Sequence, residues 1–331
     1  MARRRMRAYD AGMKIAVLDD WQHVARGSAD WAPLQARAEI VFFHAPPGDE
    51  DEVAARLAEF DIIMAMRERT PFPASLVRRL PRLKMFSLPG HRARLIDMAE
   101  MTRRGITVCT TGGGDSGAST AELALALMLA AARGVAQGDA TIRTGQFQMG
   151  TAAGIELAGR TLGVIGLGRI GRLMARYGTA LGMRVLAWSP NLTADAASAG
   201  GATLAAKDDL LAQADVVSLH LVLSDRSAGI IGADALARMK QGAILVNTSR
   251  AGLVDLPALY AALRERRLIA ALDVFEIEPL PPDHPILALP NTVLTPHIGY
   301  GTIETFREFY GLCVANVLAY LDGAPTNVFK P

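Results

Sequence analysis

A glycine-rich motif stands between a short apolar run and a helix-like segment. Residues 161–171 read TLGVIGLGRIG, so three glycines follow the apolar run with the spacing G-x-G-x-x-G. Gly166 permits a tight turn, Gly168 lets a pyrophosphate approach the backbone, and Gly171 lets the helix pack on the strand. The N–H groups that begin the helix would face the phosphates, and Arg169 can add a charge-assisted contact. Because a strand, a helix and a second strand are all predicted here, the motif predicts dinucleotide binding.

The end of the next predicted strand bears on the choice between NAD and NADP. Proteins that bind NAD commonly carry Asp or Glu there, about 20 residues further on, to bind the ribose 2′-hydroxyl. This chain has Ser189 at that place, in the run LAWSPN. It therefore has no carboxylate to repel a 2′-phosphate, and no Arg or Lys follows at once to attract one. Both coenzymes stay open, with a slight preference for NAD.

Three further segments carry candidate reactive residues. They read NTSRAG over 247–252, LDVFEIEP over 272–279 and LTPHIG over 294–299. Taken singly, an arginine after a strand is usually a surface charge, and a lone Pro-His step is usually a turn. Together with the glycine motif, and in this order, they resemble the D-isomer-specific 2-hydroxyacid dehydrogenases. That family includes phosphoglycerate dehydrogenase and glyoxylate/hydroxypyruvate reductase, and the resemblance extends from Lys14 to the end of the chain.

The resemblance implies a catalytic set of Arg250, Glu278 and His297. The planar guanidinium of Arg250 would hold a 2-oxo acid through its carboxylate and carbonyl oxygens. His297 would protonate the carbonyl oxygen as hydride arrives from the nicotinamide, and would take the proton back in the oxidation. Glu278 would orient the imidazole and favour its protonated form. Glu276 competes for this role, and the family pattern D-V-F-x-x-E-P selects Glu278.

The same resemblance implies which residues contact a nicotinamide coenzyme, NAD or NADP. Asp273 matches the position that binds the nicotinamide carboxamide, and its alternative role is a cap at the end of a strand. The other predicted contacts are Gly166, Gly168, Arg169, Ile170, Gly171, Ser189, Thr248, Ser249 and Gly299. No metal is expected, because the histidines show no ligand spacing such as H-E-x-x-H.

A loop early in the chain departs from the family pattern. The run SLPGHR over 87–92 stands where family members bind the substrate carboxylate through backbone N–H groups. Pro89 has no N–H, which leaves Gly90 as a donor. The predicted substrate contacts are Arg67, Gly90 and Arg250. A phosphorylated or dicarboxylic substrate would suit a cluster of Arg67, Arg69, Arg92 and Arg94. The alternative is that these arginines face solvent or pair with Glu68.

Short apolar runs alternate with helical stretches along most of the chain. Strands are predicted at 15–18, 61–66, 84–87, 106–110, 161–165, 183–188, 215–220, 243–247, 269–274 and 292–294. Helices are predicted between them, including 119–132 and 257–267. This alternation predicts an α/β fold with doubly wound parallel sheets in two domains. The resemblance adds that a Rossmann nucleotide-binding domain is inserted into a flavodoxin-like substrate domain.

The domain boundaries are expected near two turn-rich segments. The run TGGGDSGA over 111–118 precedes helix 119–132, which looks like a spine between two domains. Residues 14–118 and 298–331 are expected to form the substrate domain, residues 119–297 the NAD(P)-binding domain, and residues 1–13 a disordered leader. The chain ends soon after its last predicted helix, so no further regulatory domain is expected. Because family members commonly dimerise through the nucleotide domain, a homodimer is expected.

Composition excludes several other classes of protein. The chain has 331 residues, of which 50% are hydrophobic and 21% charged, which is typical of a globular protein and not of a disordered or fibrous one. A net charge of +2 without a cluster does not favour nucleic acid. The longest apolar run, 123–132, is about half of a ~20-residue membrane span. Cys109 and Cys313 cannot form a disulfide framework or a structural zinc site, which favours reduced thiols in the cytoplasm.

Other functions compete with a dehydrogenase that acts on a small 2-oxo or 2-hydroxy acid. Phosphite dehydrogenase uses a related Arg-Glu-His set and is not excluded by these residues. An NAD-sensing co-repressor of the same fold would act by protein contacts, but such proteins tend to carry long interaction tails, which this sequence does not show. Formate dehydrogenase carries an amide beside its histidine, so Glu278 argues against it.

Overall fold

The computed structural model describes residues 12–46, 48–67, 69–90, 95–111 and 117–330. The chain divides into two compact units, one of residues 1–115 with 301–331 and one of residues 116–300. Each unit is built on its own parallel sheet, which confirms the predicted α/β class with two such sheets. Most of the predicted leader lies outside the described residues, as do Glu68, Arg92 and Arg94.

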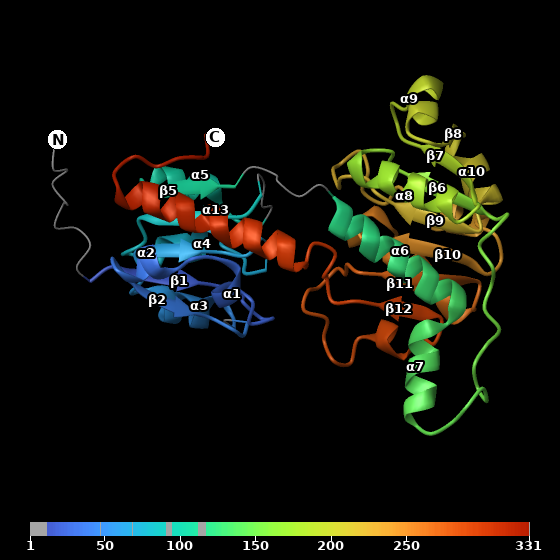
Figure 1. Cartoon of the computed structure of the whole chain (residues 1–331), viewed down its shortest axis with the longest axis horizontal. Helices are drawn as coiled ribbons and strands as arrows, with labels where there is room; N and C mark the ends of the chain where they lie inside the picture. Colours follow the sequence, from blue (N-terminus) through green and yellow to red (C-terminus); the bar gives the residue numbers. More distant parts are fainter. Residues whose placement is uncertain (1–11, 47, 68, 91–94, 112–116, 331) are drawn as a thin grey trace. The chain divides into compact units, whose positions relative to one another are not determined.

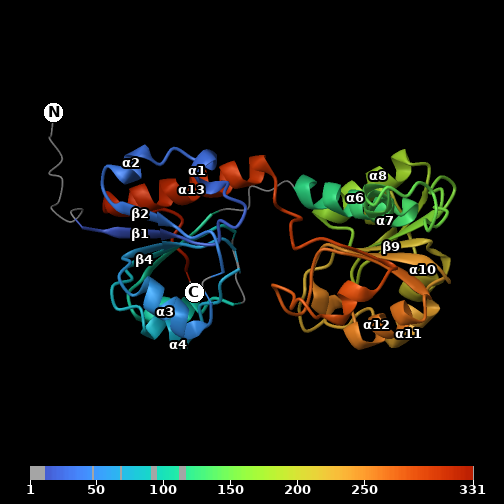
Figure 2. The same cartoon turned by 90° about the horizontal axis from the view of Figure 1, so that it is seen from below.

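The first unit holds a five-stranded sheet in the order β2-β1-β3-β4-β5, which is the flavodoxin-like order. Its strands are β1 (Lys14–Val17), β2 (Glu39–Phe42), β3 (Ile62–Met64), β4 (Met85–Leu88) and β5 (Thr107–Thr110). Its helices are α1 (Ala25–Ser28), α2 (Ala32–Gln35), α3 (Glu50–Leu57), α4 (Ala74–Arg78), α5 (Met98–Arg103) and α13 (Ile303–Leu321). Helices α1, α2 and α13 cover one face of the sheet, and α3 and α4 cover the other (Figures 1 and 2).

The second unit holds a seven-stranded sheet in the order β12-β11-β10-β9-β6-β7-β8. In chain order this is the doubly wound nucleotide-binding arrangement with one added strand. The strands are β6 (Thr161–Ile165), β7 (Arg184–Trp188), β8 (Thr203–Leu204), β9 (Val216–Leu219), β10 (Ala243–Asn247), β11 (Leu268–Leu272) and β12 (Thr292–Leu294). The helices are α6 (Ala118–Arg133), α7 (Val135–Arg143), α8 (Arg169–Ala180), α9 (Ala194–Ala199), α10 (Lys207–Gln213), α11 (Ala233–Arg238) and α12 (Leu256–Arg264), with short 3₁₀ turns at Ala251–Leu253 and Pro285–Ala288. Helices α6 and α8 lie on one face, and α11 and α12 on the other (Figure 2).

Burial explains why the inner strands have no polar alternation. Strands β3, β4, β6, β9 and β10 are buried at every residue, because helices cover both faces of each sheet. All ten predicted strands are present, with ends that differ by two residues at most. The sequence missed β2, an edge strand that is only partly covered, and β8, which has two exposed residues. Strand β8 has little apolar signal, whereas β2 reads EIVF and is an apolar run that the prediction passed over.

Helix α6 extends the predicted helix 119–132 by one residue at each end. It packs on α8 and on strands β10, β11 and β12, so it is an element of the second unit, where the sequence suggested a spine between the two domains. No single helix in the described part of the chain is long and apolar enough to cross a membrane. Helices α6 and α7 reach that length only together, and they are bent by 65° at their junction.

Candidate active site

The predicted residues of the second unit follow the ends of adjacent parallel strands. Because parallel strands end at the same edge of a sheet, side chains that follow them lie along one edge, where ligands bind in doubly wound folds. After β6, β7, β9, β10, β11 and β12, respectively, come the glycine motif, Ser189, His220, the run Thr248–Arg250, Asp273 and the turn that holds His297.

The three motif glycines differ in what the protein itself requires of them. Gly166 has a φ of +100°, and a Cβ there would lie 2.7 Å from the carbonyl carbon and oxygen of His220. At Gly171 a Cβ would lie 2.0 Å from the carbonyl oxygen of Gly166. Both positions therefore need glycine for internal packing. A Cβ at Gly168 would meet nothing within 4 Å, so this glycine leaves open backbone beside the start of α8. This arrangement fits a dinucleotide whose phosphates approach the backbone.

Glu278, in the loop that joins β11 to β12, forms a pair with His297, in the turn that follows β12. The Nδ1 atom of His297 lies 2.5 Å from the Oε2 atom of Glu278, and the other carboxylate oxygen accepts the N–H of Phe275 at 2.8 Å. His297 has a φ of 53°, in the left-handed region that non-glycine residues rarely adopt. Both side chains of the pair are about one third exposed. The carboxylate fixes the orientation of the ring through Nδ1. The other ring nitrogen, Nε2, takes no part in the contact with Glu278.

The surroundings of Glu278 keep its carboxyl group ionised. Burial acts to raise the pKa of Glu278, but it is outweighed by the hydrogen bond and charge of His297, the N–H of Phe275 and the charge of Arg250. The pKa of Glu278 therefore lies below its ordinary value. The ionised carboxylate is a strong acceptor for the ring of His297.

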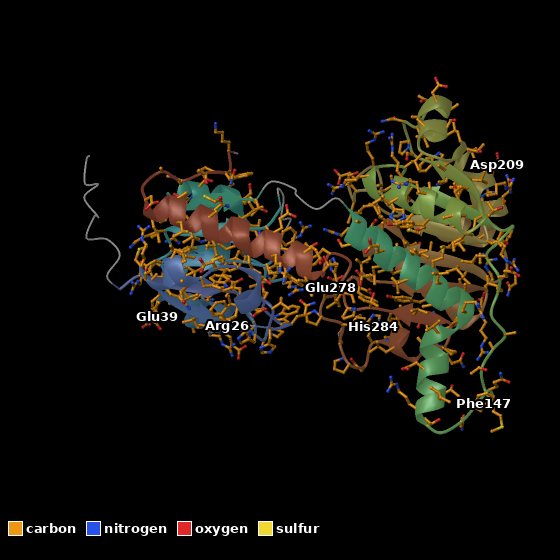
Figure 3. The ribbon with its side chains drawn as sticks, in the orientation of Figure 1. Arg26, Glu39, Phe147, Asp209, Glu278 and His284 are labelled. Carbon is orange, nitrogen blue, oxygen red and sulfur yellow. The ribbon has the colours of Figure 1, made fainter. Side chains whose placement is uncertain are left out.

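Glu276, the competing carboxylate, has other partners. Both of its oxygens accept from the hydroxyl of Tyr260 at 3.0 Å, and one lies 3.2 Å from Nε2 of His284. Glu278 and His284 both belong to the segment between β11 and β12 (Figure 3). The structure thus pairs Glu278 with His297 and ties Glu276 to a separate cluster.

Asp273 braces the turn that carries His297. Its Oδ1 accepts from the hydroxyl of Thr295 at 2.6 Å and the N–H of Ile298 at 2.9 Å, and its Oδ2 accepts the N–H of Gly299 at 2.8 Å. The side chain is buried, and burial raises the pKa of Asp273 against the opposing effect of these bonds and of the charge of His297. These three hydrogen bonds fit the alternative role that the sequence suggested for Asp273, a cap at the end of a strand. Its contact with a nicotinamide stays a prediction.

Arg250 lies after β10, directly before the 3₁₀ turn Ala251–Leu253. Its Nη1 donates to the carbonyl oxygen of Ser249 at 2.8 Å, and its own carbonyl oxygen accepts from the side-chain amide of Asn247 at 2.9 Å. The hydroxyl of Ser249 donates to the carbonyl oxygen of Leu219 at 2.8 Å, which ties this loop to the end of β9. Arg250 is half-buried, and its charge acts on Glu278. The structure thus groups the predicted catalytic set at one edge.

Two buried polar atoms at this edge have no hydrogen-bond partner within the described residues. They are Oγ1 of Thr248 and Nδ1 of His220. The Nε2 atom of His220 lies 2.8 Å from the hydroxyl of Ser218, and burial lowers the pKa of His220 to about 4, so its ring is neutral. Unpaired buried polar atoms are costly, which favours a ligand that reaches them. Thr248 was predicted as a coenzyme contact. His220 was not predicted as a coenzyme contact. It lies next to Gly166 because β6 pairs with β9, and the sequence does not reveal that pairing.

In the first unit, the structure brings the two predicted substrate contacts together. A Cβ on Gly90 would lie 2.6 Å from Nη1 of Arg67, and Gly90 has a φ of +90°. Glycine at this position therefore gives the guanidinium room. The N–H of Gly90, predicted as a donor to substrate, donates instead to Oγ1 of Thr111 at 2.9 Å. Thr111 directly follows β5, which pairs with β4, and sequence spacing does not reveal this pairing.

Arg69 is committed to a buried cluster at the end of β1. Its guanidinium donates to the carbonyl oxygen of Asp19 at 2.7 Å and to Oε1 of Gln22 at 3.2 Å, and lies over the ring of Trp21. The hydroxyl of Thr70 donates to Oδ1 of Asp19 at 2.7 Å. Burial raises the pKa of Asp19 to about 6 against these favourable contacts. This cluster holds the segment that follows Arg67 in place.

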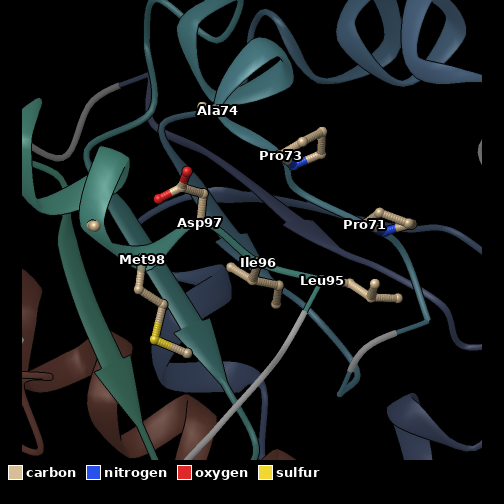
Figure 4. Close-up of a pocket in the computed structure, with 8 residues that line it drawn as sticks. Pro71, Pro73, Ala74, Leu95, Ile96, Asp97 and Met98 are labelled. Carbon is tan, nitrogen blue, oxygen red and sulfur yellow. The ribbon is translucent and has the colours of Figure 1, made fainter. Parts of the chain in front are cut away.

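A surface cavity of about 620 Å³ in the first unit does not have the chemistry of an anion site. It is lined by Pro71, Pro73, Ala74, Leu95, Ile96, Asp97, Met98 and Ala99 (Figure 4). Asp97 is the charged residue among these described lining residues, and its carboxylate caps α5 by accepting the N–H of Glu100 at 2.8 Å. In the described ranges, no three His, Cys, Asp or Glu side chains gather as metal ligands do.

Comparison with known proteins agrees with this geometry. The sequence profile of the D-isomer specific 2-hydroxyacid dehydrogenase, NAD binding domain, matches residues 125–299. A glyoxylate reductase of Korarchaeum cryptofilum is 37% identical over 284 residues, which cover 84% of this chain and 85% of that protein. This chain belongs to the D-isomer specific 2-hydroxyacid dehydrogenase family.

Other members of the D-isomer specific 2-hydroxyacid dehydrogenase family are similarly close. A D-3-phosphoglycerate dehydrogenase of Archaeoglobus fulgidus is 40% identical over 276 residues. The match covers 83% of this chain and 52% of that protein, so the chain spans about half the length of this relative. The crystal structure of a phosphoglycerate oxidoreductase from Vibrio cholerae superposes with a TM-score of 0.89 at 37% identity, covering 94% of this chain and all of that one. The predicted fold is therefore that of the family.

Proposed function

We propose that the protein is an NAD(P)-dependent D-2-hydroxyacid dehydrogenase that interconverts a 2-oxo acid and a 2-hydroxy acid. The observation that carries the proposal is the contact of His297 with an ionised Glu278, on the same sheet edge as Arg250. A proton donor, a carboxylate that holds it and a guanidinium are what the reduction of a 2-oxo acid requires.

Each residue of the set has a separate task. Arg250 binds the substrate carboxylate and carbonyl oxygen through its planar fork, which fixes the substrate against the catalytic histidine. His297 donates a proton from Nε2 to the carbonyl oxygen in the reduction and accepts it in the reverse direction. Glu278 stabilises the imidazolium, and Asp273 holds the turn from Thr295 to Gly299 on which the ring depends. The pair therefore supplies and removes the one proton of the reaction.

The second unit is proposed to hold the coenzyme. Its diphosphate binds at the start of α8, beside the motif glycines Gly166, Gly168 and Gly171. Ser189 lies where the adenosine ribose is expected. The unpartnered hydroxyl of Thr248 and the ring of His220 are further contacts that the buried atoms support. When bound, the nicotinamide supplies the hydride in reduction and receives it in oxidation. NAD and NADP both fit this motif.

The first unit is proposed to be the substrate domain. Arg67 is its candidate contact for the substrate anion, since Gly90 leaves space around its guanidinium. The family contains a phosphoglycerate dehydrogenase and a glyoxylate reductase at similar identity, so identity alone does not select the substrate. Gly90 is proposed to act by making room for Arg67.

A homodimer is proposed on the surface of α7 and the loop that follows it. Helix α7 has no buried residue, and Val135, Ile142, Phe147 and Met149 are each more than half exposed. Phe147 lies beyond the end of α7 in the second unit (Figure 3). An exposed apolar group of this kind marks a protein interface, and a second copy is the partner proposed for it. Sedimentation velocity is expected to give a dimer, which Phe147→Asp converts to a monomer.

The proposal is tested by following NADH and NADPH oxidation with glyoxylate, hydroxypyruvate, 3-phosphohydroxypyruvate and 2-oxoglutarate. Turnover is expected with at least one pair, and it falls by about 100-fold or more in Arg250→Ala, because the substrate loses its bidentate partner. Arg264→Ala, which removes an exposed arginine at the end of α12, serves as the matched control and keeps wild-type turnover. Absence of turnover with every pair, in protein that binds NAD(H), would contradict the proposal. Phosphite would then be the next substrate to test, followed by a protein partner.

A further inference from the structure

A cavity of about 490 Å³ adjoins the glycine motif on the surface of α8. It is lined by Leu167, Gly168, Arg169, Arg172, Leu173 and Arg176. The three arginines stand three and four residues apart on one helix, so their side chains share a face. All three are exposed, and within the described residues none of them forms an ion pair. No acidic residue is among the lining residues.

This combination of charge and place indicates an anionic ligand. Three guanidinium groups on one helix face repel one another, and an anion with more than one negative charge relieves that repulsion. The positive end of α8 adds to the same field, since Arg169 is its first residue. The diphosphate of a coenzyme bound at Gly168 would be the ligand of Arg169. It leaves Arg172 and Arg176, one and two turns along the helix, without an assigned ligand.

Leu167 connects this cavity with the end of β7. Its N–H donates to the hydroxyl of Ser189 at 3.1 Å, and its carbonyl oxygen accepts from Nε of Arg172 at 3.5 Å. Ser189 and Arg172 thus contact the two sides of one residue. In doubly wound dinucleotide sites, the residue at the end of this strand faces the ribose 2′ position. The 2′ position therefore adjoins a neutral hydroxyl on one side and a guanidinium on the other.

We infer that Arg172, with Arg176 behind it, binds the 2′-phosphate of NADP(H), and that this protein prefers NADP(H) to NAD(H). The inference rests on the proposed function, because it requires a coenzyme at the glycine motif. A carboxylate in place of Ser189 would repel the 2′-phosphate, and the hydroxyl does not. The sequence favoured NAD slightly because no basic residue follows Ser189. The structure supplies the basic groups from α8, some 17 positions earlier in the chain.

The test is the direct binding of NADPH and NADH to the full chain, measured by the change in protein fluorescence. Wild type is expected to bind NADPH at least tenfold more tightly than NADH. Arg172→Ala is expected to weaken NADPH about tenfold and to leave NADH within twofold. Arg176→Ala has the same direction and a smaller effect, and Arg264→Ala, on the exposed face of α12, changes neither affinity. In Ser189→Asp the new carboxylate lowers the affinity for NADPH and not for NADH.

The probes 2′,5′-ADP and 5′-ADP separate the phosphate contact from the rest of the coenzyme. Tighter binding of 2′,5′-ADP that Arg172→Ala abolishes supports the inference. Equal affinity of wild type for NADH and NADPH overturns it, as does a loss in Arg172→Ala that is the same for both coenzymes, because the arginines would then serve the diphosphate. In either case the proposed dehydrogenase stands. Absence of binding for both coenzymes would overturn the inference and the proposed function together.

Discussion

The two parallel sheets use their carboxyl edges in different ways. At the edge of the second unit, Oγ1 of Thr248 and Nδ1 of His220 have no hydrogen-bond partner among the described residues, and Gly168 leaves open backbone. At the edge of the first unit, Arg69 and Thr70 donate to Asp19 and the N–H of Gly90 donates to a hydroxyl, although Oδ2 of Asp19 and Nε1 of Trp21 also have no hydrogen-bond partner among the described residues. The difference is that the backbone at Gly168 is open to an external molecule, whereas the bonds of Arg69 fix the loop that follows Arg67.

Two of the buried aspartates that follow strands, Asp273 and Asp19, differ in what they hold. Asp273, after β11, accepts three hydrogen bonds that hold the turn with His297. Asp19, after β1, accepts one side-chain hydrogen bond, from Thr70, and its Oδ2 has no partner in the part of the chain that the structure describes. Burial raises the pKa of both carboxyl groups. The donors to Asp273 hold a turn of the candidate active site, whereas Thr70, Arg69 and the N–H groups of Thr70 and Met66 favour the ionised form of Asp19 without overcoming its burial.

The largest effect is expected from Glu278→Gln. The amide keeps the size of the side chain but removes the charge that stabilises a protonated His297. We expect kcat for 2-oxo acid reduction to fall by about 10²–10⁴-fold, with the dissociation constant of NAD(P)H unchanged. Glu276→Gln is the matched control, since Glu276 contacts Tyr260 and His284 instead. A loss of similar size in both variants would remove the distinction between these two carboxylates.

An intermediate effect is expected from alanine in the glycine motif. Gly168→Ala adds a methyl group that meets no protein atom within 4 Å, so the thermal midpoint stays near wild type while coenzyme binding weakens about tenfold. Gly171→Ala places its methyl group 2.0 Å from the carbonyl oxygen of Gly166, so that variant loses stability as well. Calorimetry and coenzyme titration of both variants check this. Equal destabilisation of the two would show that Gly168 also serves internal packing.

The smallest effect is expected from Asp19→Asn in the first unit. The folded-state pKa of Asp19 is raised to about 6 from 3.8, so the folded chain binds a proton more tightly than the unfolded chain. Stability of the wild type is therefore lost as the pH rises from about 4 to 6, by about 3 kcal/mol in all. Asparagine carries no charge and can still accept from Thr70. The variant is expected to gain about that much free energy of unfolding at pH 7.

Urea unfolding at pH 4.5 and 7.5 measures this difference. The two proteins are expected to be closest in stability at the lower pH and to diverge at the higher one. A variant that is less stable than wild type by the same amount at both values would show that the carboxylate is required as a charge. Asp19 would then resemble Asp273 and not differ from it.

Much of the fold and part of the site could be predicted from the sequence. Buried strands are continuous apolar runs, which the sequence shows directly. The spacing of Gly166, Gly168 and Gly171 predicts a tight turn between a strand and a helix. The contact of His297 with Glu278 came from the family pattern, since two residues 19 positions apart give no local signal of their contact. The two meet because β12 pairs with β11.

The remainder depends on neighbours that are distant in the chain. His220 approaches Gly166 because β9 pairs with β6, and the N–H of Gly90 is taken by a hydroxyl after β5, 21 residues further on. Leu167, which accepts from Arg172, meets Ser189 because β6 pairs with β7. Strand β8 has two exposed residues and no apolar pattern to detect. Spacing along the chain cannot report such contacts, because tertiary pairing creates them.

The most direct test of the dehydrogenase site is one paired measurement on His297→Gln. Single-turnover oxidation of bound NADPH or NADH by the preferred 2-oxo acid is compared with coenzyme affinity in the same preparation. We expect the rate to fall by about 10³-fold or more, because the proton donor is lost, while the affinity for coenzyme stays within about twofold of wild type. A variant that reduces the 2-oxo acid at a rate within tenfold of wild type would contradict the role of His297 as the acid/base.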